Sequence, residues 1–211
     1  MPLFGAPWQV ELGPMTTAAG QVRLRPIRTR DAAVWSRLRL ANQRELQPWE
    51  PTGDGSWARR HQPTAWPPMS STMRSQAREG TLLPLVIEVN GRFAGQLTVG
   101  NIVRGQLMNA WVGYWVDSAV TGRGVATVSV ALALDHCFGP LGLHRVEATV
   151  RPENGPSRAV LAHVGFREEG LLRRYLHVDG QWCDHLLMGM TAEEVPDSVV
   201  ARLVRAGRAA Y

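Results

Sequence analysis

Two glycines separated by one residue, Gly122 and Gly124, lie between an apolar run that ends near Val116 and an Ala- and Val-rich run that begins at Val125. The first run is typical of a strand and the second of a helix, so the glycines lie in a strand-to-helix turn. The first amides of a helix lack intrahelical partners, and the helix dipole makes that end positive. Glycines let a bulky anion approach the backbone, so the turn suits a phosphate group. An ordinary strand-to-helix turn is the alternative.

Two familiar phosphate motifs do not fit this turn. A dinucleotide-binding fingerprint has a third glycine three residues after the second, where this chain has Thr127, and it follows a strand near the start of an α/β repeat. A P-loop needs a lysine, and this chain has none. The turn therefore suits another class of phosphate ligand.

Residues 121–126, TGRGVA, resemble the pyrophosphate loop of the GNAT N-acetyltransferases. The family pattern is Gln or Arg, two residues, Gly, one residue, then Gly or Ala. Thr121 stands where that family usually has Gln or Arg, and Arg123 lies nearby.

A second region, residues 144–182, resembles the C-terminal half of the RimJ/RimL-like acetyltransferases, which modify protein N-termini. The matching residues are the strand 145–148, then Pro152, Asn154, Ser157, Val160, Leu161, Gly165, Phe166, Glu169 and Gly170. In total the resemblance covers about residues 22–190, and within the family the chain is most similar to ribosomal-protein-alanine acetyltransferases.

The resemblance implies a GNAT fold, an α/β (α+β) architecture with a central, mostly antiparallel mixed sheet and helices on both faces. It also implies that the sheet splays after its fourth strand, at residues 109–116. We expect the acetyltransferase domain to cover residues 21–190, preceded by an N-terminal arm or short leading strand at 1–20 and followed by a C-terminal helix within 191–211.

Acetyl-CoA is the cofactor that the resemblance implies, with CoA as product and with no metal. Pantetheine would pair with the backbone of the strand at 109–116, the glycine turn would hold the pyrophosphate, and Ser157 would protonate the departing thiolate. The implied cofactor-binding residues are Trp115, Val116, Gly122, Arg123, Gly124, Val125, Ala126, Thr127, Asn154 and Ser157. For Asn154 and Ser157, an ordinary turn and helix start is the alternative.

A general base is harder to assign. The family often carries a glutamate on the strand after Glu169 and Gly170, but here residues 173–177 read RRYLH. His177 is the nearest titratable residue, and histidine suits a base near neutral pH. A solvent-facing strand histidine is the alternative, and Glu50 and Asp184 are further candidates.

An aromatic, proline-rich stretch at residues 47–68 suggests the acceptor pocket, because long loops in compact domains are often functional. The pair Pro48-Trp49 resembles an element near the family's substrate site. We expect Trp49, Glu50 and Trp66 to bind the substrate, with core packing as the alternative for the tryptophans.

The elements that must position these residues follow from periodicity and turn signals. Asn90-Gly91 between two β-rich runs is a strong hairpin signal. Strands are expected at 22–26, 82–89, 93–100, 109–116, 144–150, 166–176 and 183–190. Helices are expected from an N-cap at Thr29 to before Pro48, and at 69–78, 125–138, 156–163 and from near Pro196, with Gly165 capping the fourth.

Charge and composition argue against nucleic-acid-binding, secreted and membrane-spanning proteins. The net charge is +5 and all 23 basic residues are arginine, but they are scattered, so direct nucleic-acid binding is not favoured. No signal peptide is visible, and apolar stretches of about eight to ten residues are too short to span a bilayer. The distant Cys137 and Cys183 are expected to be reduced and buried. These features favour a cytoplasmic protein that does not enter membranes.

The predicted function is transfer of acetyl from acetyl-CoA to a primary amine by direct attack in a ternary complex. The expected acceptor is the N-terminal α-amino group of a protein or peptide, with a ribosomal protein as the candidate partner. One alternative is a small amine or aminoglycoside, although the segment 45–80 holds only Glu45, Glu50, Asp54 and Glu79 as acids. The other is a non-catalytic acyl-CoA-binding module.

Overall fold

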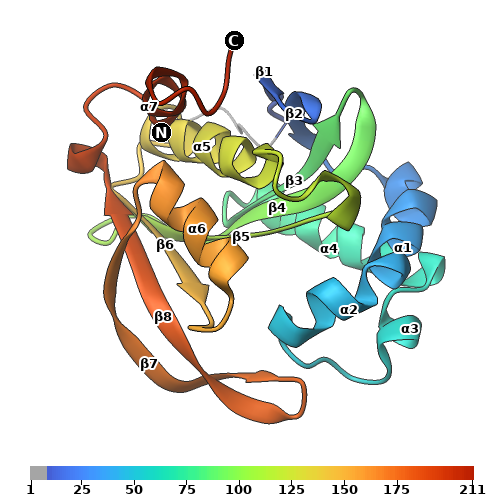
Figure 1. The fold of residues 1–211 in the computed structure, drawn as a ribbon. Helices are drawn as coiled ribbons and strands as arrows, with labels where there is room; N and C mark the ends of the chain where they lie inside the picture. Colours follow the sequence, from blue (N-terminus) through green and yellow to red (C-terminus); the bar gives the residue numbers. More distant parts are fainter. Residues whose placement is uncertain (1–8) are drawn as a thin grey trace.

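A mixed eight-stranded sheet runs through the molecule (Figure 1), and the computed structural model describes residues 9–211. The strand order is β1-β2-β3-β4-β5-β6-β8-β7. Within the described chain all neighbouring strands are antiparallel except β5 and β6. The strands are β1 (Leu12–Thr17), β2 (Gly20–Pro26), β3 (Leu82–Val89), β4 (Arg92–Val103), β5 (Asn109–Val116), β6 (Arg145–Val150), β7 (Arg167–Val178) and β8 (Gln181–Thr191). The expected mixed, mostly antiparallel sheet is confirmed.

Helices cover both faces of the sheet, as predicted. Helices α5, α6 and α7 pack together on one face, and α1 and α4 pack against β4 and β3 on the other. The α-helices are α1 (Ala32–Ala41), α2 (Gln43–Leu46), α3 (Trp57–Arg60), α4 (Trp66–Arg78), α5 (Val125–Phe138), α6 (Gly155–Val164) and α7 (Val199–Arg205). Strand β3 is accordingly apolar on both faces, with Leu85 and Ile87 in one buried cluster and Val86 in the other.

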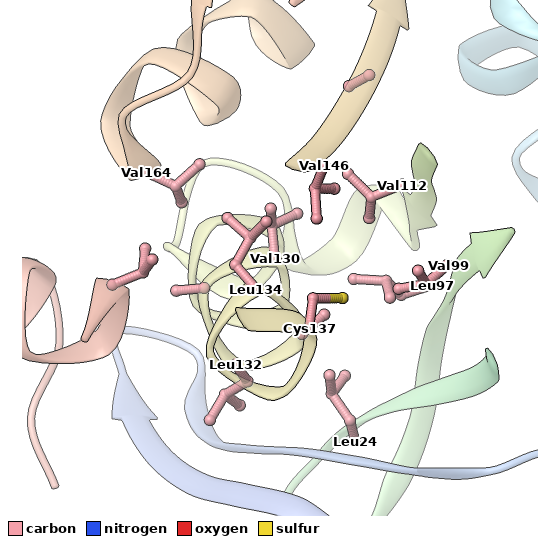
Figure 2. Close-up of a cluster of buried hydrophobic side chains, with 14 of the residues drawn as sticks. Leu24, Leu97, Val99, Val112, Val130, Leu132, Leu134, Cys137, Val146 and Val164 are labelled. Atoms are coloured by element: carbon pink, nitrogen blue, oxygen red, sulfur yellow. The ribbon is translucent and has the colours of Figure 1, made fainter. Parts of the chain in front are cut away.

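Helix α5 is the centre of the larger core. Figure 2 shows Val130, Leu134 and Cys137 on this helix among side chains from β2, β4, β5 and β6. The helix is apolar all round because the sheet, α6 and α7 surround it. Burial raises the pKa of the Cys137 thiol to about 12, which keeps it protonated. Tight packing of α5 holds its N-terminus, and therefore the glycine turn, in one place.

Local signals placed several elements correctly. Asn90 and Gly91 both have positive φ, +50° and +73°, which is the geometry of a type I′ hairpin turn. The strand at Asn109–Val116 and the helix at Val125–Phe138 have the expected bounds. Gly165 ends α6 in the left-handed region at φ +106°.

Four expectations were wrong: three about where helices begin and one about the segment 47–68. Thr29 does not cap α1, since residues 29–31 form a 3₁₀ turn and the Asp31 carboxylate instead accepts from Arg25 and from the Arg28 amide. The segment 47–68 is not one loop, because it contains α3, two 3₁₀ turns and the first turn of α4. Helix α4 begins at Trp66, as prolines fit a first turn. Helix α7 begins at Val199, capped by Ser198.

The two ends of the described chain meet beside the sheet. Residues 1–8, part of the expected arm, lie outside the described residues, while Leu12–Thr17 form β1 antiparallel to β2. After α7, the chain turns back and Ala210 pairs with Thr16 through two backbone hydrogen bonds of 2.7 and 3.1 Å. Within the described residues, a short leading strand is therefore present at Leu12–Thr17.

Candidate active site

A large cavity opens where β5 and β6 separate. The two strands pair only from Asn109 to Trp111 on β5 and from Arg145 to Glu147 on β6. Beyond that point they diverge, as predicted for the strand at 109–116, and a cavity of about 1560 Å³ lies in the gap. Its walls come from β5, the turn before α5, the end of β6, the start of α6 and the segment 44–51.

The glycine turn forms part of the wall of this cavity. Gly122 and Gly124 have φ values of +72° and +83°, which non-glycine residues rarely adopt. Gly124 is the N-cap of α5, so the first amides of the helix face outward without intrahelical partners. A methyl group on Gly122 would meet no protein atom within 4 Å, so the space above it is open to a ligand. These features fit a pyrophosphate group.

The splayed edge of β5 provides a second binding surface. Trp115 and Val116 are half-buried and line the cavity, while their other edge pairs with Gln96 and Gly95 of β4. The β6 side of this stretch has no strand partner within the described chain. An extended, amide-containing arm can therefore add to the sheet here as a further strand would.

Two hydroxyl groups meet at the start of α6. The Asn154 side chain caps this helix by accepting from the Ser157 amide at 3.1 Å. The Ser157 hydroxyl lies 3.0 Å from the phenol oxygen of Tyr114 on β5, and all three residues line the cavity. Burial raises the pKa of Tyr114 to about 12, so the phenol stays protonated and the pair can donate to a nearby anion.

Elsewhere in the cavity wall, Glu50 lies among basic side chains. Its carboxylate contacts the Arg39 guanidinium, lies 3.4 Å from Arg60 and lies 3.6 Å from Nε2 of His61. The Arg39 guanidinium stacks between the rings of Trp57 and Trp115, at 4.7 and 5.1 Å from their centres. This cluster is therefore next to the splayed edge of β5.

His61 is held as a neutral hydrogen-bond acceptor. Its Nδ1 lies 2.8 Å from the Trp57 carbonyl, which can only accept, so the proton is on Nδ1 and Nε2 carries the lone pair. Burial and the Arg39 charge lower the pKa of His61 to about 4, despite the bond to Trp57. Burial and Arg60 also lower the pKa of Arg39 to about 9. Two acceptors, the Glu50 carboxylate and His61 Nε2, thus lie side by side.

A second histidine, His185 on β8, was not anticipated. It is buried, lines the cavity and bonds through Nδ1 to the Cys183 carbonyl at 3.1 Å. Burial lowers its pKa, so the neutral imidazole is favoured. Tyr114, Arg39 and His61 were also missed. Tyr114 could have been found from its place beside Trp115, whereas nothing in the sequence pointed to the histidines.

The other predicted site residues divide into two groups. All ten predicted cofactor-binding residues line the cavity, as do Trp49 and Glu50. Trp66 does not, because it is fully buried against Trp35 and donates to the Arg28 carbonyl at 2.8 Å. Trp66 is therefore a core residue, which was the alternative expectation.

The two remaining candidate bases also lie outside the cavity. His177 packs edge-on against Trp182 at 5.5 Å between ring centres, and it does not line the cavity. Asp184 accepts from the Arg174 amide at 2.7 Å, which stabilises the positive φ of Arg174 in β7. Neither side chain therefore lines the cavity.

The described residues can be compared with the requirements of a metal site and of a membrane-spanning helix. Among residues 9–211, no three His, Cys, Asp or Glu side chains are grouped closely enough to hold a metal ion. Over the same residues, no helix is both long and apolar enough to cross a bilayer.

Three features are typical of an acyl-CoA-dependent transferase: the splayed mixed sheet, the glycine turn at the start of the buried helix α5, and the cavity that joins them. Residues 21–167 match the family described as "Acetyltransferase (GNAT) domain", and the chain belongs to this GNAT acetyltransferase family. The protein is an acetyl-CoA-dependent N-acetyltransferase.

Named relatives support the same class. The solved structure of Mycobacterium smegmatis RimJ in complex with CoA-disulfide is 60% identical, with a TM-score of 0.95 over 97% of this chain and 98% of that one. The ribosomal protein uS5-alanine N-acetyltransferase of Escherichia coli (strain K12) is 28% identical over 91% of this chain and 97% of that protein. The probable N-acetyltransferase YjcK of Bacillus subtilis (strain 168) is 39% identical, but the match spans 47% of this chain and 55% of YjcK.

Proposed function

We propose that this enzyme acetylates the N-terminal α-amino group of a ribosomal protein by direct attack in a ternary complex with acetyl-CoA. One observation carries the proposal: a single cavity joins the glycine turn to the acceptor pair of Glu50 and His61. The similarity over most of the chain to RimJ and to the uS5-alanine enzyme supports a ribosomal-protein acceptor, and we assign the reaction to the cytoplasm.

Three parts of the chain bind acetyl-CoA at the donor end, which is the part of the cavity at the glycine turn and the splayed edge of β5. The glycine turn at Gly122 and Gly124 holds the pyrophosphate through amides of α5, and the splayed backbone of Trp115 and Val116 holds the pantetheine arm. A β5 amide on the splayed edge would donate to the thioester carbonyl of bound acetyl-CoA, the group on which negative charge would develop. Bound acetyl-CoA supplies an activated acetyl thioester. Holding both substrates in one cavity gives the remaining advantage of proximity.

At the acceptor end, the Glu50 carboxylate and His61 Nε2 accept hydrogen bonds from the amine. Two acceptors 3.6 Å apart match the two N–H groups of a neutral amine. The charges of Arg39 and Arg60 exceed that of Glu50, so the local potential disfavours an ammonium and lowers the pKa of the bound amine. After attack, the Glu50 carboxylate takes the proton that the amine nitrogen loses.

Ser157 and Tyr114 complete the reaction at the leaving group. The Ser157 hydroxyl donates a proton toward the departing thiolate, and Tyr114, 3.0 Å away, resupplies it. The raised pKa of Tyr114 keeps that proton available over the working pH range. This donor pair argues against the alternative of a non-catalytic acyl-CoA-binding module.

The surroundings of the acceptor end favour a polypeptide over a small polycation. The β7–β8 hairpin joins the segment after Glu50 through a hydrogen bond of 2.8 Å from the Thr52 amide to the His177 carbonyl. It carries the exposed aromatic side chains of Tyr175 and Trp182, which offer a contact surface for a protein. The excess of arginine over carboxylate would repel an aminoglycoside.

A matched pair of peptides tests the proposal. One peptide has a free N-terminal alanine and no lysine, and its twin has a blocked N-terminus and one lysine. With acetyl-CoA and a thiol-release readout, we expect acetylation of the first peptide to be at least tenfold faster. Mass spectrometry locates the acetyl group. Faster modification of the blocked twin, or of an aminoglycoside, would overturn the N-terminal assignment, and absence of thiol release with every amine would favour the binding module.

A further inference from the structure

The last residues of the chain form a wall of the cavity beside the glycine turn. Residues 207–210 and 16–18 both line the cavity next to residues 121–127. The family match ends at residue 167 and begins at residue 21, so both of these short segments lie outside it. The structure therefore has a part of the cavity that the matched domain does not provide.

The turn after α7 directs the chain to this position. Gly207 has φ +65° and donates to the Val204 carbonyl, and the Arg208 amide donates to the Leu203 carbonyl at 2.9 Å. This pattern ends a helix and reverses the chain, and it needs glycine at the left-handed position. Helix α7 itself is fixed to α5, because Asp135 accepts from the Ser198 hydroxyl and the Val199 amide, each at 2.6 Å.

Two contacts hold the tail against the phosphate end of the cavity. Ala210 and Thr16 exchange both backbone hydrogen bonds, so the tail adds one bridge to the edge of β1 (Figure 1). The Arg208 carbonyl lies 3.7 Å, and the Thr17 side chain 3.8 Å, from where a methyl group on Gly124 would lie. The tail and β1 therefore flank the N-cap of α5.

Charge at this end is positive and uncompensated. Arg123 and Arg208 line the cavity, are exposed, and have no ion pair or side-chain hydrogen bond in the described chain. Arg205, three residues before Arg208, differs because it pairs with Asp197 at 3.6 Å and does not line the cavity. Two unpaired guanidinium groups beside a helix N-terminus form a site for a polyanion.

We propose that residues 16–18 and 207–210 form a subsite for the nucleotide part of acetyl-CoA, in which Arg208 binds a phosphate. This inference rests on acetyl-CoA as donor but not on the identity of the acceptor. The tail closes over the nucleotide, so the affinity for CoA depends on the last residues of the chain.

Calorimetry on three variants tests the subsite. Arg208→Ala is compared with Arg205→Ala as a matched control, and a chain that ends at Ala206 removes the wall. The probes are CoA, 3′-dephospho-CoA and pantetheine. We expect Arg208→Ala to raise the Kd for CoA about tenfold, the truncation to raise it further, and Arg205→Ala to leave it within twofold. None of the variants should change the weak binding of pantetheine.

The probes also separate the two phosphate positions. A loss with CoA that disappears with 3′-dephospho-CoA assigns Arg208 to the ribose phosphate, and an equal loss with both assigns it to the pyrophosphate. An unchanged Kd for Arg208→Ala with a folded protein overturns the subsite, even where the truncated chain fails to fold. If the parent enzyme binds CoA but does not acetylate peptide N-termini, the proposed function fails while the subsite stands.

Discussion

Replacing Gly122 by alanine tests the phosphate cradle most directly. At φ +72°, an L-residue costs about 1 kcal/mol in backbone strain, whatever surrounds it. The added methyl group meets no protein atom within 4 Å, so no further loss of stability is expected. It does enter the space where the pyrophosphate would lie against the amides of α5. The substitution should therefore affect stability slightly and CoA binding strongly.

Gly105 provides a matched control. It lies in the turn between β4 and β5 at φ +74°, a methyl group there also meets no atom within 4 Å, and it does not line the cavity. Gly105→Ala and Gly122→Ala should thus lose about the same stability. The difference between the two variants in CoA affinity then reports the cradle alone.

The size of the effect follows from the hydrogen bonds at risk. A hydrogen bond to a charged group is worth about 1.5–3 kcal/mol, so displacing the pyrophosphate from one amide should weaken CoA binding about 10- to 100-fold. Denaturant unfolding gives the stability of both variants, and calorimetry gives the Kd. Equal Kd values for Gly122→Ala, Gly105→Ala and the parent would refute the assignment of the turn as the cradle.

Three further predictions concern the chemistry. Ser157→Ala should lower kcat about a hundred-fold with little change in the Kd for CoA. Adding Tyr114→Phe should lower kcat little further, because the two hydroxyls act as one unit. A kcat within twofold of the parent would remove Ser157 from the mechanism. Glu50→Gln should raise the KM for an alanine-terminal peptide about tenfold and also lower kcat, because Glu50 takes the proton of the amine, while the Kd for CoA stays within twofold; unchanged KM and kcat would exclude Glu50 from the acceptor site. The pKa of His61 is lowered to about 4 in the folded protein, so the unfolded chain binds more protons between about pH 6.5 and pH 4. As the pH falls over that range, the free energy of unfolding should decrease by up to about 3 kcal/mol, and by less in His61→Gln. Urea unfolding at each pH measures both decreases.

The cofactor end could be predicted from the sequence because it is built from continuous segments. The strand at 109–116 and the helix at 125–138 are long and strongly patterned, and the glycines between them determine the turn. Asn154 and Ser157 are likewise three residues apart at one helix start. Local chain geometry places the two glycines at the start of α5 and Asn154 beside Ser157, whereas the expected roles of these residues toward CoA came from the family resemblance.

At the acceptor end, Trp49 and Glu50 were expected and line the cavity, but the residues around Glu50 could not be predicted in the same way. Glu50, Arg39 and His61 come from three separate short elements, and their contacts depend on tertiary packing that no local pattern reveals. The position of the predicted base His177, which does not line the cavity, depends on the register of β7. Strand β7 has an irregularity between Leu172 and Leu176, and such a shift changes which face each later side chain occupies.

The charges at the acceptor end explain why an α-amine suits this site better than a lysine. An α-amino group has a pKa of about 7.7–8.0 and a lysine side chain one of about 10.4, a difference worth roughly 3 kcal/mol in forming the neutral nucleophile. In the proposed site, Arg39 and Arg60 beside a single carboxylate would lower the pKa of a bound amine, but each unit so gained would also weaken binding of the ammonium form. An α-amine needs little of this shift and loses little affinity. A lysine needs several times more, and the neutral His61, with its pKa of about 4, is too weak a base to make up the difference.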